Sequence, residues 1–429
     1  MNETPPQRWL RDHALLALRI NRHMAGAATG TVLVYRGPRK WSEQVAAEAP
    51  VPPGRLAEDA EALLAGLHGT DGGPVTPGRV RYLSAQVRAM RAVARQLAGR
   101  ELPLPEYARA CLGVPVERLP EELFEEAHSR LDAALPRGTG SLHERLESWK
   151  TAHSLPPEEL ADRLPPLVGR AVAETRRRTG AIVPLPEGEE VRCRIVPGAL
   201  FRGAGDHEGG LRSTLYIGGG RPFNLADLLY VVAHEGHPGH IAESLLKERV
   251  LVEERGLLDQ RVRFMLAPAF VISEGLGLHA QEIVFPGDEA QRWLTDHVLA
   301  AQGTASDGSD FAAIHRVQNL LFGVWANAAL LAAEGRPGHE VAAYLSRWAL
   351  LSDAETAAAM GSLKATGMAL YIFAYFHGWR LLDSWLAVPD RSARVRRLLT
   401  EQLLPSDLTA AAGPEDRKSR EKPGVRADE

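Results

Sequence analysis

Three histidines and a glutamate, residue types that commonly bind and assist a zinc ion, lie together in one short stretch of the chain. They are His234, Glu235, His237 and His240, and the residues just before them, 231–233, are apolar. Buried imidazoles and carboxylates are costly without partners, and a metal ion is the simplest partner for such groups. A glutamate beside a ligating histidine can also act as the general base that activates a water. The stretch therefore predicts a metal site with Glu235 as the base.

The spacing of the histidines decides which of them can share one metal ion. In the familiar zinc helix the two histidines lie four residues apart, but the residue four after His234 is Pro238. On a regular helix His240 lies about 600° around the axis from His234 and points away from it. Because Pro238 cannot continue the helical hydrogen bonds and Gly239 tolerates unusual backbone angles, a break there could bring His240 back beside His234. We favour this pairing, and the alternative pairs His234 with His237 on one face of an undistorted helix.

A catalytic zinc site needs a third protein ligand and leaves one position open for water. The segment 270–278 contains a single carboxylate, Glu274, among apolar residues. We therefore predict one Zn²⁺ per chain, bound by His234, His240 and Glu274. Glu282 is the competing third ligand. Glu243 is a candidate for holding one ligand histidine in its metal-binding tautomer.

The elements around these residues are predicted to be mainly helical. Apolar residues at helical spacing indicate helices over 55–68, 78–100, 120–135 and 141–152, and helices dominate again from residue 224 to residue 404. β-Branched residues at 191–196 and 213–217 indicate two strands, separated by a Gly-rich loop over 198–210. We expect a mainly α fold with a small β-hairpin or sheet beside the metal-binding helix. The strand 213–217 could bind an extended peptide along its edge.

The chain divides by composition into three parts. Residues 1–183 form an N-terminal helical region, and residues 184–404 form a metal-binding region that combines the small β element with helices. Residues 405–429 are polar and rich in charge, with almost nothing to bury, so we expect a disordered tail.

The bulk composition of the 429 residues is that of an ordinary soluble protein, since 45% are hydrophobic and 24% are charged. A net charge of −4 is too mild to indicate nucleic acid or an anionic membrane as a partner. Two cysteines, Cys111 and Cys193, do not make a disulfide framework. Residues 1–13 lack the apolar core of a secretion signal, and no apolar run reaches the roughly 18–20 residues of a membrane span. We therefore expect a cytoplasmic protein.

These motifs resemble those of a bacterial family known as domain of unknown function 885, which belongs with the zincin metallopeptidases of the gluzincin type. The family's His-Glu-x-x-Pro-Gly-His element is matched by His234, Glu235, Pro238, Gly239 and His240. Its second element, Glu-Gly-Trp-Ala-Leu-Tyr-Ala-Glu, is similar to residues 274–281, and its Tyr-x-x-Gly element is similar to residues 375–378. The chain departs from the family pattern at Leu276, His279, Gln281, Ala369 and Tyr371.

The resemblance implies a mostly helical fold with a deep cleft, a His-His-Glu zinc site, and hydrolysis of peptide or amide bonds. It also implies that Tyr375 lies at the site, where its hydroxyl could donate to the oxyanion that forms during hydrolysis. Tyr371, His377 and Arg380 are nearby alternatives for this donor. The expected partner is a peptide or a small amide substrate.

Three other functions remain open at this stage. The same site could serve a metal-dependent amide, ester or carbon–nitrogen bond enzyme acting on a small metabolite, and the departures from the family pattern favour altered chemistry. A helical binding protein with a degenerate site is a second alternative. Non-haem iron chemistry also uses two histidines and one carboxylate, but it gives Glu235 no role.

Overall fold

The computed structural model describes residues 3–25, 31–68, 76–365 and 367–410, and its fold is mainly helical, as the sequence predicts. The helices are α1 (Pro5–Ala25), α2 (Arg39–Ala47), α3 (Pro53–His68), α4 (Pro77–Leu97), α5 (Leu104–Leu112), α6 (Glu122–Ala134), α7 (Leu142–Ala152), α8 (Pro157–Gly180), α9 (Leu228–Glu235), α10 (His240–Lys247), α11 (Pro268–Val284), α12 (Glu289–Leu294), α13 (Phe311–Ala333), α14 (Gly338–Ala349), α15 (Asp353–Lys364), α16 (Met368–Leu386), α17 (Arg391–Thr400) and α18 (Pro405–Ala410). The strands are β1 (Leu33–Tyr35), β2 (Ser154–Leu155), β3 (Glu190–Val196), β4 (Gly203–Gly209), β5 (Arg212–Gly218), β6 (Phe223–Asn224) and β7 (Val262–Phe264).

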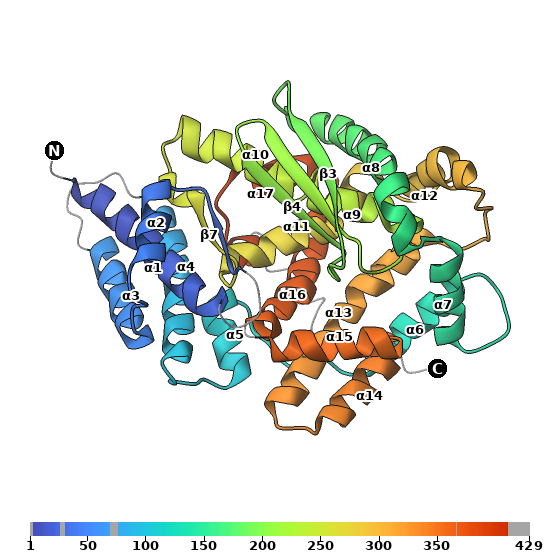
Figure 1. Cartoon of the computed structure of the whole chain (residues 1–429), viewed down its shortest axis with the longest axis horizontal. Helices are drawn as coiled ribbons and strands as arrows, with labels where there is room; N and C mark the ends of the chain where they lie inside the picture. The colour runs from blue at the N-terminus through green and yellow to red at the C-terminus, as the bar shows by residue number, and fades with distance from the viewer. Residues whose placement is uncertain (1–2, 26–30, 69–75, 366, 411–429) are drawn as a thin grey trace, which may run out of the picture.

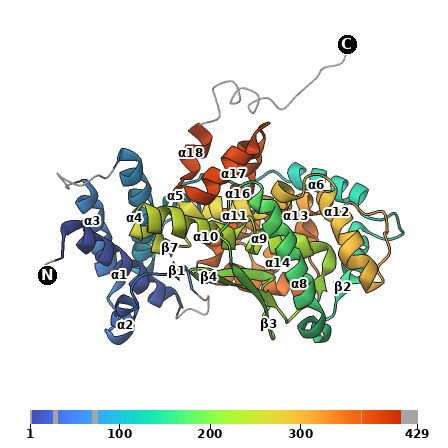
Figure 2. The same ribbon diagram turned by 90° about the horizontal axis from the view of Figure 1, so that it is seen from above.

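The helices pack around two hydrophobic cores that share three central helices. The first core joins α1, α3, α4 and α5, which gather at one end of the molecule, and the second includes α6 to α10 and α12 to α15 (Figures 1 and 2). Helices α11, α13 and α16 contribute apolar residues to both cores. Both cores draw residues from each side of position 183, so the division of the chain there stays a prediction from composition alone.

Helix α11 carries Glu274 and is buried on nearly every side. A helix that is apolar all around its circumference belongs in the interior of a protein, and all but two of the residues of α11 are buried. Glu274 is therefore held in the middle of the molecule, and any group that contacts its carboxylate must come from a neighbouring element.

Helices α11 and α16 cross with their backbones in contact, because both carry a glycine at the crossing. A Cβ atom built on Gly275 would lie 2.4 Å from the carbonyl oxygen of Gly378, and one built on Gly378 would lie 2.2 Å from the carbonyl oxygen of Val271. Neither glycine can gain a side chain unless the helices separate. The crossing brings the first turns of α16 beside Glu274.

Two strands over 191–196 and 213–217 are confirmed as β3 and β5, but the Gly-rich loop predicted over 198–210 is wrong because it contains a third strand, β4. The strand order is β3-β5-β4, with β3 parallel and β4 antiparallel to β5. The sequence of β4 lacks β-branched residues because the strand lies directly on α9. A Cβ atom at Gly205 would lie 2.1 Å from the Glu235 carbonyl oxygen, and one at Gly203 would lie 2.9 Å from Val231 Cγ1.

The position of β5 in the middle of this sheet corrects a second expectation. Both sides of β5 are already hydrogen-bonded, to β3 and to β4, so it has no free edge for a peptide. Strand β4 is at the edge of the three-stranded sheet instead.

A separate two-stranded ribbon joins β1 to β7, far apart in the sequence. The pairing is antiparallel, with Val34 opposite Arg263. Backbone hydrogen bonds extend it at both ends, from Arg36 N to Arg261 O at 2.8 Å and from Met265 N to Val32 O at 2.8 Å.

The end of the described chain also differs from the expectation of a disordered tail over residues 405–429. Residues 405–410 form α18, and Leu408 is 3% exposed and packs against one of the two cores, so disorder is wrong for this segment. Residues 411–429 lie outside the described residues. Among the described residues no single helix is long and apolar enough to cross a membrane, although α15 and α16, bent by 107° at the break between them, together meet the length and composition criteria.

The glycine crossing can be tested by adding one methyl group. We expect Gly275→Ala to lower the free energy of unfolding by about 1–3 kcal/mol, because the new Cβ overlaps backbone atoms that cannot rotate aside. Gly169→Ala is the matched control, since Gly169 also lies inside a helix but a Cβ there meets nothing within 4 Å. Both changes gain the same helix propensity, so the difference between their urea unfolding curves isolates the overlap. Equal unfolding free energies for the two variants would contradict close backbone packing at this crossing.

Candidate metal centre

The metal-binding helix breaks where the sequence predicts. Helix α9 ends at Glu235, and α10 begins at His240, so residues 236–239 form a tight connection rather than a bulge within one helix. The connection includes a cis peptide bond between His237 and Pro238. Gly239 packs so closely on the end of α9 that a Cβ there would lie 1.8 Å from the carbonyl oxygen of His234.

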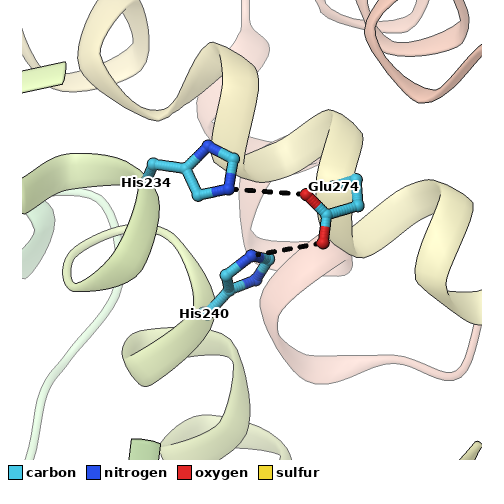
Figure 3. Close-up of side chains that lie close together, drawn as sticks. All are labelled: His234, His240 and Glu274. Carbon is cyan, nitrogen blue, oxygen red and sulfur yellow. Dashed lines mark ion pairs between the residues drawn. The ribbon is translucent and has the colours of Figure 1, made fainter. Parts of the chain in front are cut away.

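The break brings His240 beside His234, with both rings facing Glu274 on α11 (Figure 3). His234 Nε2 lies 3.5 Å from Glu274 Oε2, and His240 Nε2 lies 3.6 Å from Glu274 Oε1. One ligand atom from each of the three residues lies within 4.8 Å of the others. Around a tetrahedral zinc ion with bonds of about 2.0–2.2 Å, neighbouring ligand atoms lie roughly 3.3–3.6 Å apart. The two His–Glu distances match this spacing, so these three side chains could hold a single metal ion.

The carboxylate of Glu274 is almost fully buried, so its charge needs partners more than any other group of the site. It is 2% exposed, and its Oε1 accepts a hydrogen bond from the Tyr371 hydroxyl. Its Oε2 is buried without a hydrogen-bond partner among the described residues. Burial alone would raise the pKa of Glu274, but His240, His234 and Tyr371 outweigh it and lower the pKa below its ordinary value. A buried, ionised oxygen without a hydrogen bond is well suited to a cation.

A glycine on α11 makes room for the ring of His234. A Cβ atom at Gly277 would lie 2.6–2.8 Å from three atoms of the His234 imidazole, so only glycine allows the ring to lie against this helix. Burial would lower the pKa of His234, but the carboxylates of Glu235 and Glu274 outweigh it and raise the pKa.

His240 is oriented by a chain of polar contacts that ends at Glu243. The Ser273 hydroxyl lies 3.2 Å from His240 Nδ1 and donates to Glu243 Oε2 at 2.5 Å. Burial would raise the pKa of Glu243, but Arg263 and Lys247 outweigh it and hold the pKa well below its ordinary value, so the carboxylate accepts the serine proton. The serine oxygen can then accept from Nδ1–H, which leaves the lone pair of Nε2 directed at the metal position.

The two competing ligands lie elsewhere. His237 is fully buried, and its Nε2 lies 3.0 Å from Glu189 Oε1, so it belongs to an ion-pair cluster with Arg176. Glu282 is about half exposed and lies 3.7 Å from Arg316 on the surface. The geometry therefore excludes both from the cluster of His234, His240 and Glu274.

Glu235 lies beside the ligand cluster without belonging to it. Its Oε1 is 4.0 Å from His234 Nε2, and its Oε2 accepts a hydrogen bond of 2.9 Å from the backbone N–H of Gly205 on β4. This bond holds the carboxylate beside the candidate ligands.

The candidate metal position opens into a cavity of about 310 Å³. Its lining includes the three candidate ligands, Glu235, and both tyrosines of α16, Tyr371 and Tyr375. The Tyr375 hydroxyl makes no hydrogen bond within the part of the chain that the structure describes, whereas Tyr371 is engaged by Glu274. His377 and Arg380 do not line this cavity, which leaves Tyr375 as the donor best placed for a substrate.

Several lining residues were not among the site residues predicted from the sequence. Strand β4 contributes Gly203 to His207, and the β1–β7 ribbon contributes Arg36, Arg261 and Arg263. One half of the ribbon had a detectable signal, because residues 261–264 alternate between arginine and an apolar residue, whereas residues 32–35 are all apolar. The Gly-x-Gly within β4 was a second signal, since glycines inside a strand often mark a close approach of backbones.

The ligand assignment can be tested by changing one histidine at a time. We expect His240→Ala to lose bound zinc, because one of three ligands is removed, and His237→Ala to retain about one zinc per chain. Elemental mass spectrometry of the purified proteins measures both. The reverse pattern, with zinc lost only in the His237 variant, would contradict the geometry described here.

Comparisons with known proteins do not assign the chain to a family. No family model matches the chain, and no curated protein matches it in sequence. A solved structure of a proposed lipoprotein from Colwellia psychrerythraea is 15% identical, with a TM-score of 0.49, and the match covers 82% of this chain and 65% of that one. A proposed lipoprotein of unknown function from Shewanella oneidensis is 11% identical, with a TM-score of 0.48, over 82% of this chain and 72% of that one. The chain thus spans less than two thirds of the first of these proteins.

Proposed function

We propose that this chain is a zinc-dependent hydrolase of the metallopeptidase kind, which cleaves peptide or amide bonds with one Zn²⁺ bound by His234, His240 and Glu274. The observation that carries the proposal is the convergence of three ligand side chains in a cavity beside Glu235. The buried Glu274 oxygen without a hydrogen-bond partner supports a cation at this point. Two histidines and one glutamate, with a free carboxylate beside them, are typical of hydrolytic zinc sites.

Zinc bound by these residues would polarise a carbonyl group and lower the pKa of water toward about 7. Glu235 takes the proton from the attacking water and later passes it to the leaving amine. Gly205 N–H holds one oxygen of this carboxylate, which leaves the other free to receive the proton. The base is thus pre-oriented by a backbone group that cannot rotate away.

Tyr375 acts as the hydrogen-bond donor to the oxygen on which negative charge develops. Burial, followed by the nearby Glu274, raises its pKa well above the ordinary value, so the hydroxyl keeps its proton at neutral pH. Its ring stacks on Phe322, with centroids 4.8 Å apart, which restrains the direction of the hydroxyl. A fixed donor aimed at a developing oxyanion is a large contribution to catalysis in hydrolases.

The edge strand β4 supports a peptide as the substrate. Residues Gly203 to His207 line the cavity, and the Gly205 N–H points away from β5 toward Glu235. An extended peptide added along this edge would present its carbonyl groups near the base. The modest cavity volume of about 310 Å³ also suits a short peptide or a small amide metabolite, which keeps the small-metabolite enzyme as the second candidate.

The role of Glu235 has a direct test. Glu235→Gln keeps the size of the side chain and an oxygen that can accept from Gly205, but it cannot take a proton. We expect the variant to retain zinc and to lose at least about a hundredfold in turnover. Turnover near that of the unsubstituted enzyme would remove Glu235 as the base. Zinc-loaded protein that cleaves no member of a broad peptide panel would instead favour the small-metabolite candidate.

Substitution of Tyr375 and of Tyr371 should affect different properties of the enzyme. We expect Tyr375→Phe to lower kcat by about a hundredfold or more with zinc retained, because only the oxyanion donor is lost. Tyr371→Phe removes the donor to Glu274 and should weaken zinc affinity by about 10–100-fold. Competition with a chelator measures the affinity, and steady-state kinetics at saturating zinc measure kcat. Equal kinetic effects of the two changes would mean that Tyr375 has no separate role.

A further inference from the structure

The β1–β7 ribbon forms one wall of the cavity, and the face that it presents there is rich in arginine. Side chains alternate between the two faces of a strand, so every second residue shares a face. Residues 32, 34 and 36 of one strand segment and 261, 263 and 265 of the other all line the cavity. On the opposite face, Leu33, Val262 and Phe264 pack into the first core, with residues of α1, α3, α4 and α5. The ribbon thus places Arg36, Arg261 and Arg263 in the same cavity as the candidate metal centre.

Two of these three arginines form hydrogen-bonded ion pairs with carboxylates. Arg263 lies 2.9 Å from Glu243 Oε2 and is 14% exposed, and it helps to hold the chain of contacts behind His240. Arg36 forms an ion pair with Asp206 across the cavity. Both guanidinium groups are thus already hydrogen-bonded to a carboxylate.

Arg261 is different, because its side chain makes no hydrogen bond within the described residues. The nearest carboxylate oxygen, on Glu248, is 3.8 Å from its Nη2, and the other oxygen of Glu248 lies 2.9 Å from His207 Nε2. The Nε of Arg261 is buried without a partner. A buried donor without an acceptor costs free energy that a ligand can recover. The guanidinium offers five N–H donors and no acceptor, in a planar fork that matches a carboxylate.

We infer that Arg261 binds a carboxylate group of the substrate, so that the enzyme acts on peptides or N-acyl amino acids that carry a free carboxylate near the bond to be cleaved. A group with a single negative charge matches the one guanidinium without a hydrogen-bonded carboxylate. A phosphate dianion would bring a second negative charge into a cavity that already holds Asp206, Glu248, Glu235 and Glu274. The inference rests on the proposed function for the reaction, but the binding of the carboxylate is independent of turnover.

The carboxylate can come from two sources, the C-terminal α-carboxylate or the side chain of an acidic residue. Both present the same group to the guanidinium. A set of N-acetyl-Ala-Xaa dipeptides, with Xaa covering the common amino acids and each made as free acid and as C-terminal amide, separates them. A preference for acids over their own amides indicates the α-carboxylate. A preference, among the amides, for Asp and Glu over Asn and Gln indicates the side chain.

Binding is measured by equilibrium dialysis with mass spectrometry, on the zinc-loaded Glu235→Gln protein so that no peptide is consumed. We expect carboxylate dipeptides to bind at least about tenfold more tightly than their uncharged partners. Arg261→Gln in the same background should abolish the preference, and Arg261→Lys should keep part of it, because a lysine retains the charge but not the fork. Arg255→Gln is the control, since Arg255 is exposed and does not line the cavity.

The outcomes distinguish this inference from the proposed function. A carboxylate preference that persists in Arg261→Gln, or no preference in the protein that retains Arg261, would overturn the inference. Cleavage of the same dipeptides by the unsubstituted enzyme is measured in parallel. A preference that depends on Arg261, without cleavage of any dipeptide, would uphold the carboxylate site and argue against the hydrolase. Cleavage without a preference for carboxylates would support the hydrolase and argue against the carboxylate site.

Discussion

The burial of one carboxylate, that of Glu274, is the constraint on which the rest of the structure depends. An ionised group in the middle of an apolar helix is costly unless charges or hydrogen-bond donors surround it. Those groups come from three other helices, since α9 supplies His234, α10 supplies His240 and α16 supplies Tyr371. Because all three side chains reach the same carboxylate, the three helices must approach α11 at the same level along its axis.

That convergence explains where the glycines of the site lie. Gly277 leaves space for the His234 ring, Gly275 and Gly378 let α11 and α16 touch, and Gly239 lets the start of α10 fold onto the end of α9. Within a helix each glycine costs about 1 kcal/mol relative to alanine, so such positions need a compensating contact. Here the compensation is the close packing that brings the polar groups to Glu274. The glycines thus allow the close approach of the helices that supplies Glu274 with its partners.

The sequence was informative wherever local rules decide the outcome. Pro238 and Gly239 favour a break in the helix, and a lone carboxylate in an apolar run favours burial. Residue types therefore favoured the grouping of His240 with Glu274, with His237 as the alternative. Strand β4 was missed because its glycines serve contact with α9, a tertiary effect that overrides strand propensity. The β1–β7 ribbon was missed because it pairs segments far apart in the chain, and no local pattern states which segments will meet. The position of Arg261 depends entirely on that pairing.

The ribbon and the metal centre are also physically connected, and Glu243 is the connection. Its carboxylate binds Arg263 on the ribbon and, through Ser273, orients His240 at the centre. Arg263 is therefore committed to the metal side of the cavity. Arg261, two residues earlier, shares its face by the period of the strand but lies beyond the reach of Glu243's network, with Glu248 engaged by His207. Arg263 and Arg261 thus line the same cavity, but Arg263 is paired with Glu243 whereas the Nε of Arg261 has no hydrogen-bond partner among the described residues.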